Sequence, residues 1–253
     1  MNPLVDNPPL LFVVTLGILC VSAWLGTLVG RMSRETDERA ERDIGVVLAA
    51  TLTLLGLIIG FSFSMAISRY DQRKNYEEAE ANAIGTEFVR ADLLPPDDAG
   101  RVRLLLKQYL DQRVLFYTTR NGDQLRMVNS KTDQLQADLW ASIRGPAEAH
   151  PTPTVALAVS GMNDVLNSQG YTQAAWWNRI PMAAWALMIL IAVLCNVLIG
   201  YSSRNMRSRR IVFLVLPVVL SISFFLIAGI DSPRRGIIHV VPQNLLSVAG
   251  TLR

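Results

Sequence analysis

Four stretches of this chain contain no charged residue, and each is 20 to 25 residues long. They are residues 10–30, 44–68, 180–203 and 211–230. A helix of about 20 apolar residues is long enough to cross a hydrocarbon core about 30 Å thick. The four stretches therefore predict four transmembrane helices, and they exclude a soluble enzyme.

The rest of the chain has the composition of a soluble protein. Only 18% of all residues are charged, against about 25% in a typical soluble domain. The uncharged stretches hold 90 residues, so the other 163 carry all 45 charged side chains. Most of these lie between the second and third stretches, where the apolar spacing is helical throughout. We expect an all-α integral membrane protein with four transmembrane helices and a helical extramembrane domain inserted between helices 2 and 3.

The expected boundaries divide the chain into four segments. Residues 1–68 hold transmembrane helices 1 and 2 with a short arginine-rich loop, and residues 69–179 form the extramembrane domain. Residues 180–230 hold transmembrane helices 3 and 4, and residues 231–253 are a C-terminal tail. Because residues 44–94 contain no proline, the second membrane helix can continue into the domain without a break.

The same sequence excludes several function classes. The pI of about 9.1 comes from arginines that flank the membrane and not from a basic face, so we expect no nucleic-acid partner. No nucleophile, base and orienting group recur at a usable spacing, so we expect no enzyme and no catalytic residue. Cys20 and Cys195 lie inside predicted membrane helices, and His150 and His239 are the two histidines, so we expect no metal site and no cofactor.

Two short arginine-rich loops set the expected orientation. They contain Arg31, Arg34, Arg39 and Arg42 in residues 31–43, and Arg204, Arg207, Arg209 and Arg210 in residues 204–210. Because short arginine-rich loops are retained in the cytoplasm, both termini and residues 69–179 are expected on the periplasmic side. Six basic residues lie close to the opposite membrane face, so a cytoplasmic domain stays open as the alternative.

Small residues recur every four positions along the first two membrane helices. The ridge on the second helix is Gly56, Gly60 and Ser64, and the ridge on the first is Ser22, Gly26 and Gly30. Small residues let two membrane helices approach closely. The ridges therefore predict helix packing, either within one subunit or between subunits.

An apolar row lies beside the ridge of the second membrane helix. Its members are Leu55, Ile59, Phe63 and Ile67. Such a row faces lipid, a neighbouring helix or a channel axis, and a ring of apolar side chains can close a pore by expelling water. We take Ile59, Phe63 and Ile67 as candidates for a pore neck.

Charged residues just beyond the second membrane helix are candidates for a pore mouth. They are Glu77, Glu80, Glu87 and Arg73. Glu80 shares a helical stripe with Ile84 and Phe88, so we expect it to be partly buried. A carboxylate repeated around a symmetry axis would concentrate cations, whereas one paired with Arg73 or Arg90 would be structural.

Local signals predict where the other helices begin and end. Asp97 or Asp98 is a candidate N-cap, and Asn121-Gly122 predicts a turn. Gly145-Pro146 is expected to break a helix. Asn196, a polar residue within the third span, is expected to hydrogen-bond another helix.

Two regions of the chain, residues 60–95 and 230–248, match the two hallmark regions of a known family in the expected order. The residues that carry the match are Glu80, Asn82, Ile84, Gly85, Glu87, Asp231, Pro233 and Gly236. On these residues the chain resembles the bestrophin-like domain family, which consists of bacterial membrane proteins with four predicted spans. The resemblance implies a multi-pass protein of the bacterial inner (plasma) membrane.

The family is named for a distant similarity to bestrophins, which are pentameric anion channels whose second membrane helix lines the pore with an apolar neck. The resemblance therefore implies a homo-oligomer in a lipid bilayer, a pentamer by analogy, with inorganic ions as its partners. It also implies a cytosolic domain, which is opposite to the orientation from the arginine count.

The leading hypothesis is a homo-oligomeric ion channel with an apolar neck on transmembrane helix 2. The resemblance favours anions as the conducted ions, whereas the acidic mouth favours cations. The alternative is a membrane-anchored scaffold or sensor whose extramembrane helical bundle binds a partner.

Overall fold

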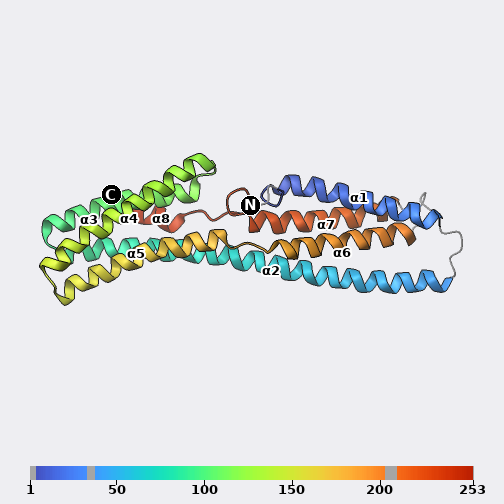
Figure 1. Ribbon diagram of the computed structural model, residues 1–253, viewed down its shortest axis with the longest axis horizontal. Coiled ribbons are helices and arrows are strands. Elements are labelled where there is room, and N and C mark those ends of the chain that lie inside the picture. The colour runs from blue at the N-terminus through green and yellow to red at the C-terminus, as the bar shows by residue number, and fades with distance from the viewer. Residues whose placement is uncertain (1–3, 33–37, 203–209, 253) are drawn as a thin grey trace. The chain divides into compact units, whose positions relative to one another are not determined.

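The computed structural model describes residues 4–32, 38–202 and 210–252, and within them every regular element is a helix. The helices are α1 (Pro8–Met32), α2 (Glu38–Arg90), the short 3₁₀ helix η1 (Ala91–Leu93), α3 (Pro96–Thr118), α4 (Gly122–Ala149), α5 (Pro153–Trp177), α6 (Met182–Ser202), α7 (Arg210–Asp231) and α8 (Gln243–Thr251) (Figure 1). Of the arginines that set the expected orientation, Arg34, Arg204, Arg207 and Arg209 lie outside the described residues.

The chain folds into two compact units. The membrane unit comprises residues 1–68 and 179–238, and the helical domain comprises residues 69–178 and 239–253, as far as these are described. The helix α2 contributes to both units, and so does the predicted tail. Four helical segments are long and apolar enough to cross a membrane, so the prediction of an all-α protein with four spans is confirmed.

In the membrane unit, α1 packs against α6 through the small residues of the first ridge. A Cβ atom on Gly26 would lie 2.1 Å from the carbonyl oxygen of Val197, and one on Gly200 would lie 2.0 Å from the carbonyl oxygen of Ala23. Both distances are far below van der Waals contact, so only glycine permits this approach of the two backbones. The ridge on the first membrane helix therefore packs within one subunit.

Several polar side chains within the membrane helices, Asn196 among them, bond to the backbone of their own helix. The Asn196 side-chain amide donates to the carbonyl oxygen of Ala192, four residues earlier on α6, at 2.8 Å. The prediction that Asn196 bonds another helix is wrong for this donor, because the carbonyl one turn back lies within reach.

The helical domain is built around one apolar core to which α2, η1, α3, α4, α5 and α8 contribute. Its largest buried side chains include Tyr109, Phe116, Ile84, Leu106 and Leu135. The rings of Phe116 and Trp176 pack edge to face, with their centroids 4.9 Å apart. Residues that recur at helical spacing in the sequence thus form the interior of this domain.

Two predicted helix boundaries differ from the structure. The helix α4 continues through Gly145 and Pro146 to Ala149, so the predicted break there is wrong. Pro146 lacks the N–H that would bond the carbonyl oxygen of Ser142, and only three residues of α4 follow it, so the disruption is confined to the last turn. At the start of α3, Pro95 occupies the N-cap position, and Asp97 and Asp98 follow in the first turn. Pro96 is the first residue of α3, and its φ angle is already set to a helical value, which accounts for the earlier start of the helix.

The predicted turn at Asn121-Gly122 is where α4 begins. The side-chain oxygen of Asn121 accepts from the backbone N–H groups of Asp123 at 2.8 Å and Gln124 at 3.4 Å. This cap satisfies donors that the first turn of a helix otherwise leaves free.

Candidate functional site

The apolar segment of α2 has few contacts within its own chain. Between residues 44 and 68, all of which are described, the buried side chains are Leu55, Ser62 and Ala66. These three lie on one stripe of the helix, and the other side chains of the segment are half-buried or exposed. By contrast, α1, α6 and α7 each bury a larger share of their apolar windows.

The candidate neck residues lie on the open part of α2. Phe63 is 37% exposed and Ile67 is 39% exposed, while Ile59 is half-buried. Leu55, the first member of the apolar row, is 1% exposed and so belongs to the stripe that packs within the chain. The row that is free to meet another surface therefore consists of Ile59, Phe63 and Ile67.

The glycine ridge of α2 is also open. A Cβ atom built on Gly56 or on Gly60 would lie within 4 Å of no other described segment of the chain, and Ser64 is exposed. This differs from the ridge on α1, where α6 fills the space beside Gly26. Of the two interpretations of the second ridge, packing within one subunit does not fit this geometry.

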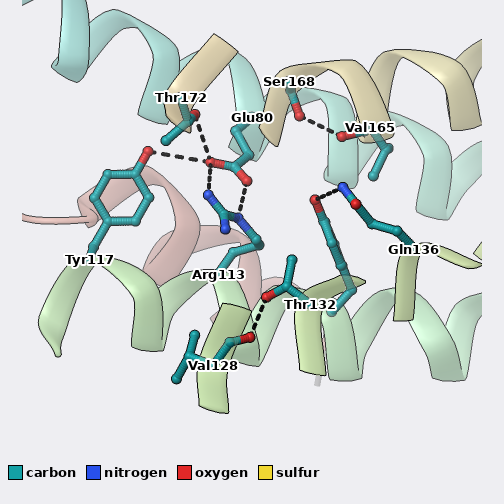
Figure 2. A network of polar contacts seen from close by, with 10 residues as sticks. Glu80, Arg113, Tyr117, Val128, Thr132, Gln136, Val165, Ser168 and Thr172 are labelled. Atoms are coloured by element: carbon teal, nitrogen blue, oxygen red, sulfur yellow. Dashed lines mark hydrogen bonds and ion pairs between the residues drawn. The ribbon is translucent and has the colours of Figure 1, made fainter. Parts of the chain in front are cut away.

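Beyond the apolar segment, Glu80 lies at the centre of a buried polar cluster (Figure 2). Arg113 of α3 forms an ion pair with Glu80 through its Nε atom. The Nη2 atom of Arg113 donates to Glu80 Oε2 at 3.4 Å. The hydroxyl groups of Tyr117 and Thr172 donate to the same oxygen at 3.3 Å and 3.1 Å. The cluster therefore ties α2 to α3 and α5.

The partner of Glu80 is Arg113, which corrects the predicted pairing with Arg73 or Arg90. Spacing along one helix pointed to the arginines of α2, whereas the observed partner lies on another helix, 33 residues further along the chain. Burial raises the pKa of the Tyr117 hydroxyl, and the charge of Glu80 raises it further. Tyr117 therefore stays protonated and keeps its role as a donor.

Glu77 of α2 caps the N-terminus of α8 at Leu245, which lies 168 residues further along the chain. Its carboxylate accepts from the backbone N–H of Leu245 at 2.9 Å and from the side-chain amide of Asn244 at 2.7 Å. These donors belong to the first turn of α8, whose own N-cap residue, Pro242, provides no side-chain cap. A negative charge at a helix N-terminus is favourable, so Glu77 stabilises the docked C-terminal helix.

All four predicted mouth residues are buried in the helical domain. Glu80 and Glu87 are 0% exposed, and Arg73 and Glu77 are 1% exposed. Their position inside a single chain does not fit the predicted role in a water-filled mouth. The physical reason is that each lies on the face of α2 that packs on other helices of the domain.

The family-motif residues of the second region shape the chain after α7. Both carboxylate oxygens of Asp231 accept from the backbone N–H of Ile180 at 3.2 Å, just before α6. A Cβ atom on Gly236 would lie 2.1 Å from the carbonyl oxygen of Gly229, which requires glycine at this position. Pro233 is buried between them. These residues hold the end of α7 beside the start of α6.

The motif residues of the first region lie on α2 within the helical domain. Asn82 is exposed. A Cβ atom on Gly85 would lie 3.8 Å from the side chain of Val248, so Gly85 faces the docked α8 at ordinary contact distance.

Several residues of these polar contacts were missed by the sequence analysis. They are Arg113, Tyr117 and Thr172 around Glu80, together with Asp6, which forms an ion pair with Arg179. Asp6 and Arg179 are separated by 173 residues, and no spacing rule joins residues so far apart. Among the described residues, no group of three or more histidine, cysteine, aspartate or glutamate side chains is placed to hold a metal ion.

Comparison with solved structures shows the same fold in bacterial bestrophin homologues. A point mutant of the homologue from Klebsiella pneumoniae is 15% identical, with a TM-score of 0.62, over 94% of this chain and 99% of that chain. A second mutant is 13% identical, with a TM-score of 0.63, over 95% and 93% of the two chains. A further structure of this homologue, solved by Zn-SAD phasing, is 15% identical, with a TM-score of 0.61, over 94% and 98%.

Comparison with curated proteins finds no match. The model of the bestrophin-like domain family matches residues 13–245, which include most of the first span, the other three spans and the helical domain up to the start of α8. The chain therefore belongs to the bestrophin-like domain family.

Proposed function

We propose that the protein is a homo-oligomeric ion channel in which α2 lines the pore. The observation that carries this proposal is the open apolar segment of α2. Among the described residues, nothing packs beside Gly56 and Gly60 of its ridge, and Phe63 and Ile67 of its apolar row are exposed. Membership of a family related to bestrophin channels supports the same function. A scaffold whose spans serve only as anchors has no need of such a helix.

The ridge of Gly56, Gly60 and Ser64 is the proposed contact with a neighbouring subunit. Helices associate in lipid mainly by close packing, and small residues allow that packing. In the part of the chain that the structure describes, no other segment fills the space beside Gly56 and Gly60. A second copy of α2 or of another span can therefore fill it.

The row of Ile59, Phe63 and Ile67 is the proposed neck. On an α-helix, residues three apart are separated by roughly 60° around the axis, so Phe63 lies beside Gly60 and not opposite it. One side of α2 can thus contact a neighbour while the adjacent side faces a central axis. A ring of these apolar side chains would form a constriction that closes by excluding water.

The proposed channel selects anions, because the sequence argument for cations does not fit the structure. The case for cations depended on Glu77, Glu80 and Glu87 as an acidic mouth, and all three are buried in the helical domain. Glu80 is also neutralised by Arg113 within the chain. With that electrostatic argument removed, the analogy with bestrophins favours anions.

The experiment is reconstitution of the purified protein in a planar bilayer under a salt gradient. We expect conductance with a reversal potential displaced toward the chloride potential, together with a homo-oligomeric mass by native mass spectrometry. A reversal potential near that of the cation would refute anion selectivity. A monomer, or an oligomer without conductance, would refute the channel and favour the scaffold or sensor.

A further inference from the structure

Glu87 is a buried carboxyl group without a hydrogen-bond partner. Its side chain is 0% exposed, and neither Oε1 nor Oε2 accepts a hydrogen bond from any described residue. It lies 19 residues beyond Ser68, the last residue of the uncharged stretch, which is roughly 28 Å further along α2 at 1.5 Å per residue. Glu87 therefore belongs to the helical domain and not to the membrane.

The other two buried glutamates of this helix show what Glu87 lacks. Glu77 accepts hydrogen bonds from two donors of α8. Glu80 receives an ion pair with Arg113 and the hydroxyl groups of Tyr117 and Thr172. An ionised carboxylate removed from water without such donors is strongly unfavourable, and such a group binds a proton instead.

The carboxyl group of Glu87 occupies space left by a glycine of α5. A Cβ atom on Gly161 would lie 2.0 Å from Glu87 Oε2 and 2.6 Å from a terminal guanidinium nitrogen of Arg90. Glu87 and Arg90 therefore both lie over Gly161, at the place where α2 packs on α5. A change of charge at Glu87 occurs directly in this helix contact.

The charged groups that face Glu87 do not compensate for its burial. Burial is the largest effect and raises the pKa of Glu87 to about 8, with Arg90 of α2 lowering it and Asp164 of α5 raising it. Arg90 is half-buried and Asp164 is exposed, so water screens both. In the next elements, Asp92 of η1 is ion-paired with Arg103 of α3.

We propose that Glu87 is a proton-binding site that holds α2 against α5 while it is protonated and weakens this contact when the proton is lost. This inference concerns the helical domain alone, and it stands whether or not α2 lines a pore. The site takes a proton from water and needs no other ligand.

The pH range follows from the raised pKa. An unfolded glutamate ionises near pH 4.5, whereas Glu87 in the folded domain ionises near pH 8. Between these values the folded protein holds one more proton than the unfolded protein, so stability decreases as pH rises. The stabilising effect of the bound proton is complete below about pH 4.5 and lost above about pH 8.

The test compares the full chain with Glu87→Gln and with Glu78→Gln, which removes an exposed carboxyl group from the same helix. Thermal unfolding in detergent is followed from about pH 5 to about pH 9.5. We expect Glu87→Gln to match the wild-type midpoint at the acid end and to exceed it at the alkaline end. Glu78→Gln should keep the wild-type pH profile.

Infrared difference spectroscopy provides the direct measurement. The wild-type protein should show the carbonyl band of a protonated carboxylic acid at neutral pH, disappearing with a midpoint near pH 8. The band should be absent in Glu87→Gln and unchanged in Glu78→Gln. If Glu87→Gln does not fold, Glu87→Asp should shift this band. A wild-type protein without the band, or the same pH profile in Glu87→Gln and wild type, would overturn the proposal, and neither result depends on conductance.

Discussion

At the scale of single residues, three buried glutamates on one helix illustrate how surroundings decide the role of a carboxyl group. Glu77 caps α8, Glu80 pairs with Arg113, and Glu87 has no donor among the described residues. The helical stripe shared with Ile84 predicted that Glu80 is partly buried, because spacing on one helix fixes which face a residue occupies, and in the structure its burial is complete. It did not predict Arg113, because a partner on another helix depends on how the helices pack.

The first prediction concerns the ion pair of Glu80. Arg113→Leu should lower the free energy of unfolding by about 3–5 kcal/mol, because it leaves a buried carboxylate without its compensating charge. Chemical unfolding in detergent, followed by circular dichroism, measures the loss.

The matched control for Arg113→Leu is Arg126→Leu. Arg126 pairs with Asp123 at the surface, where the two side chains are 79% and 77% exposed. Such pairs contribute less than about 1 kcal/mol. Equal losses in the two variants would show that the buried pair has no special structural role.

At the scale of helices, the closest packing in the membrane unit depends on glycine. Gly26→Ala should destabilise the protein by about 1–3 kcal/mol, because the new methyl group meets the backbone of α6 and neither helix can move aside freely. Gly17→Ala on the same helix is the control, since a Cβ atom there meets nothing within 4 Å. Melting temperatures in detergent compare the two, and an unchanged melting temperature for Gly26→Ala would contradict the described contact.

The docking of α8 gives a prediction for Glu77. Glu77→Gln should weaken the cap on α8, because a neutral amide interacts less favourably with the helix N-terminus than a carboxylate does. Hydrogen exchange in residues 243–251 should become faster, as measured by mass spectrometry. Glu78→Gln on the exposed face should leave this exchange unchanged, and equal rates in all three proteins would contradict the capping role.

The presence of the helices could be predicted from the sequence, but the residues at which they begin and end could be predicted less accurately. The helical spacing of apolar residues between the second and third spans predicted a helical domain, and apolar residues of α3, α4 and α5 form most of its core. The continuation of α4 through Pro146 to Ala149 was missed, because a Gly-Pro pair is a helix-breaking signal and the local sequence does not show that one more turn forms. The docking of α8 was also missed, because its cap comes from Glu77 on a distant segment.

At the scale of the whole molecule, the sequence predicts which side of the membrane holds the helical domain. The arginines of the two short loops predict both termini in the periplasm, because such loops are preferentially retained in the cytoplasm. A reporter that is active only in the periplasm, fused after Arg253, should therefore be active. Activity of a cytoplasmic reporter at the same position would reverse the orientation and agree with the bestrophin analogy.

The four spans and the inserted domain followed from the distribution of charge alone. Subunit contacts could not follow from it, because one sequence contains the same ridge whether α2 meets its own chain or another. The open space beside Gly56 and Gly60 favours a second subunit. It makes α2 the helix on which the proposed function depends.

The most direct test of the channel is whether α2 faces water along its apolar row. Phe63→Cys is introduced after Cys20 and Cys195 are replaced by serine, and ion flux into liposomes is measured before and after a water-soluble thiol reagent is added. Val219→Cys on α7, where Val219 is 51% exposed, is the control for a lipid-facing position. We predict that the reagent blocks flux through the Phe63→Cys protein and leaves flux through the Val219→Cys protein unchanged. Flux through the Phe63→Cys protein that persists after the reagent would contradict a pore lined by α2.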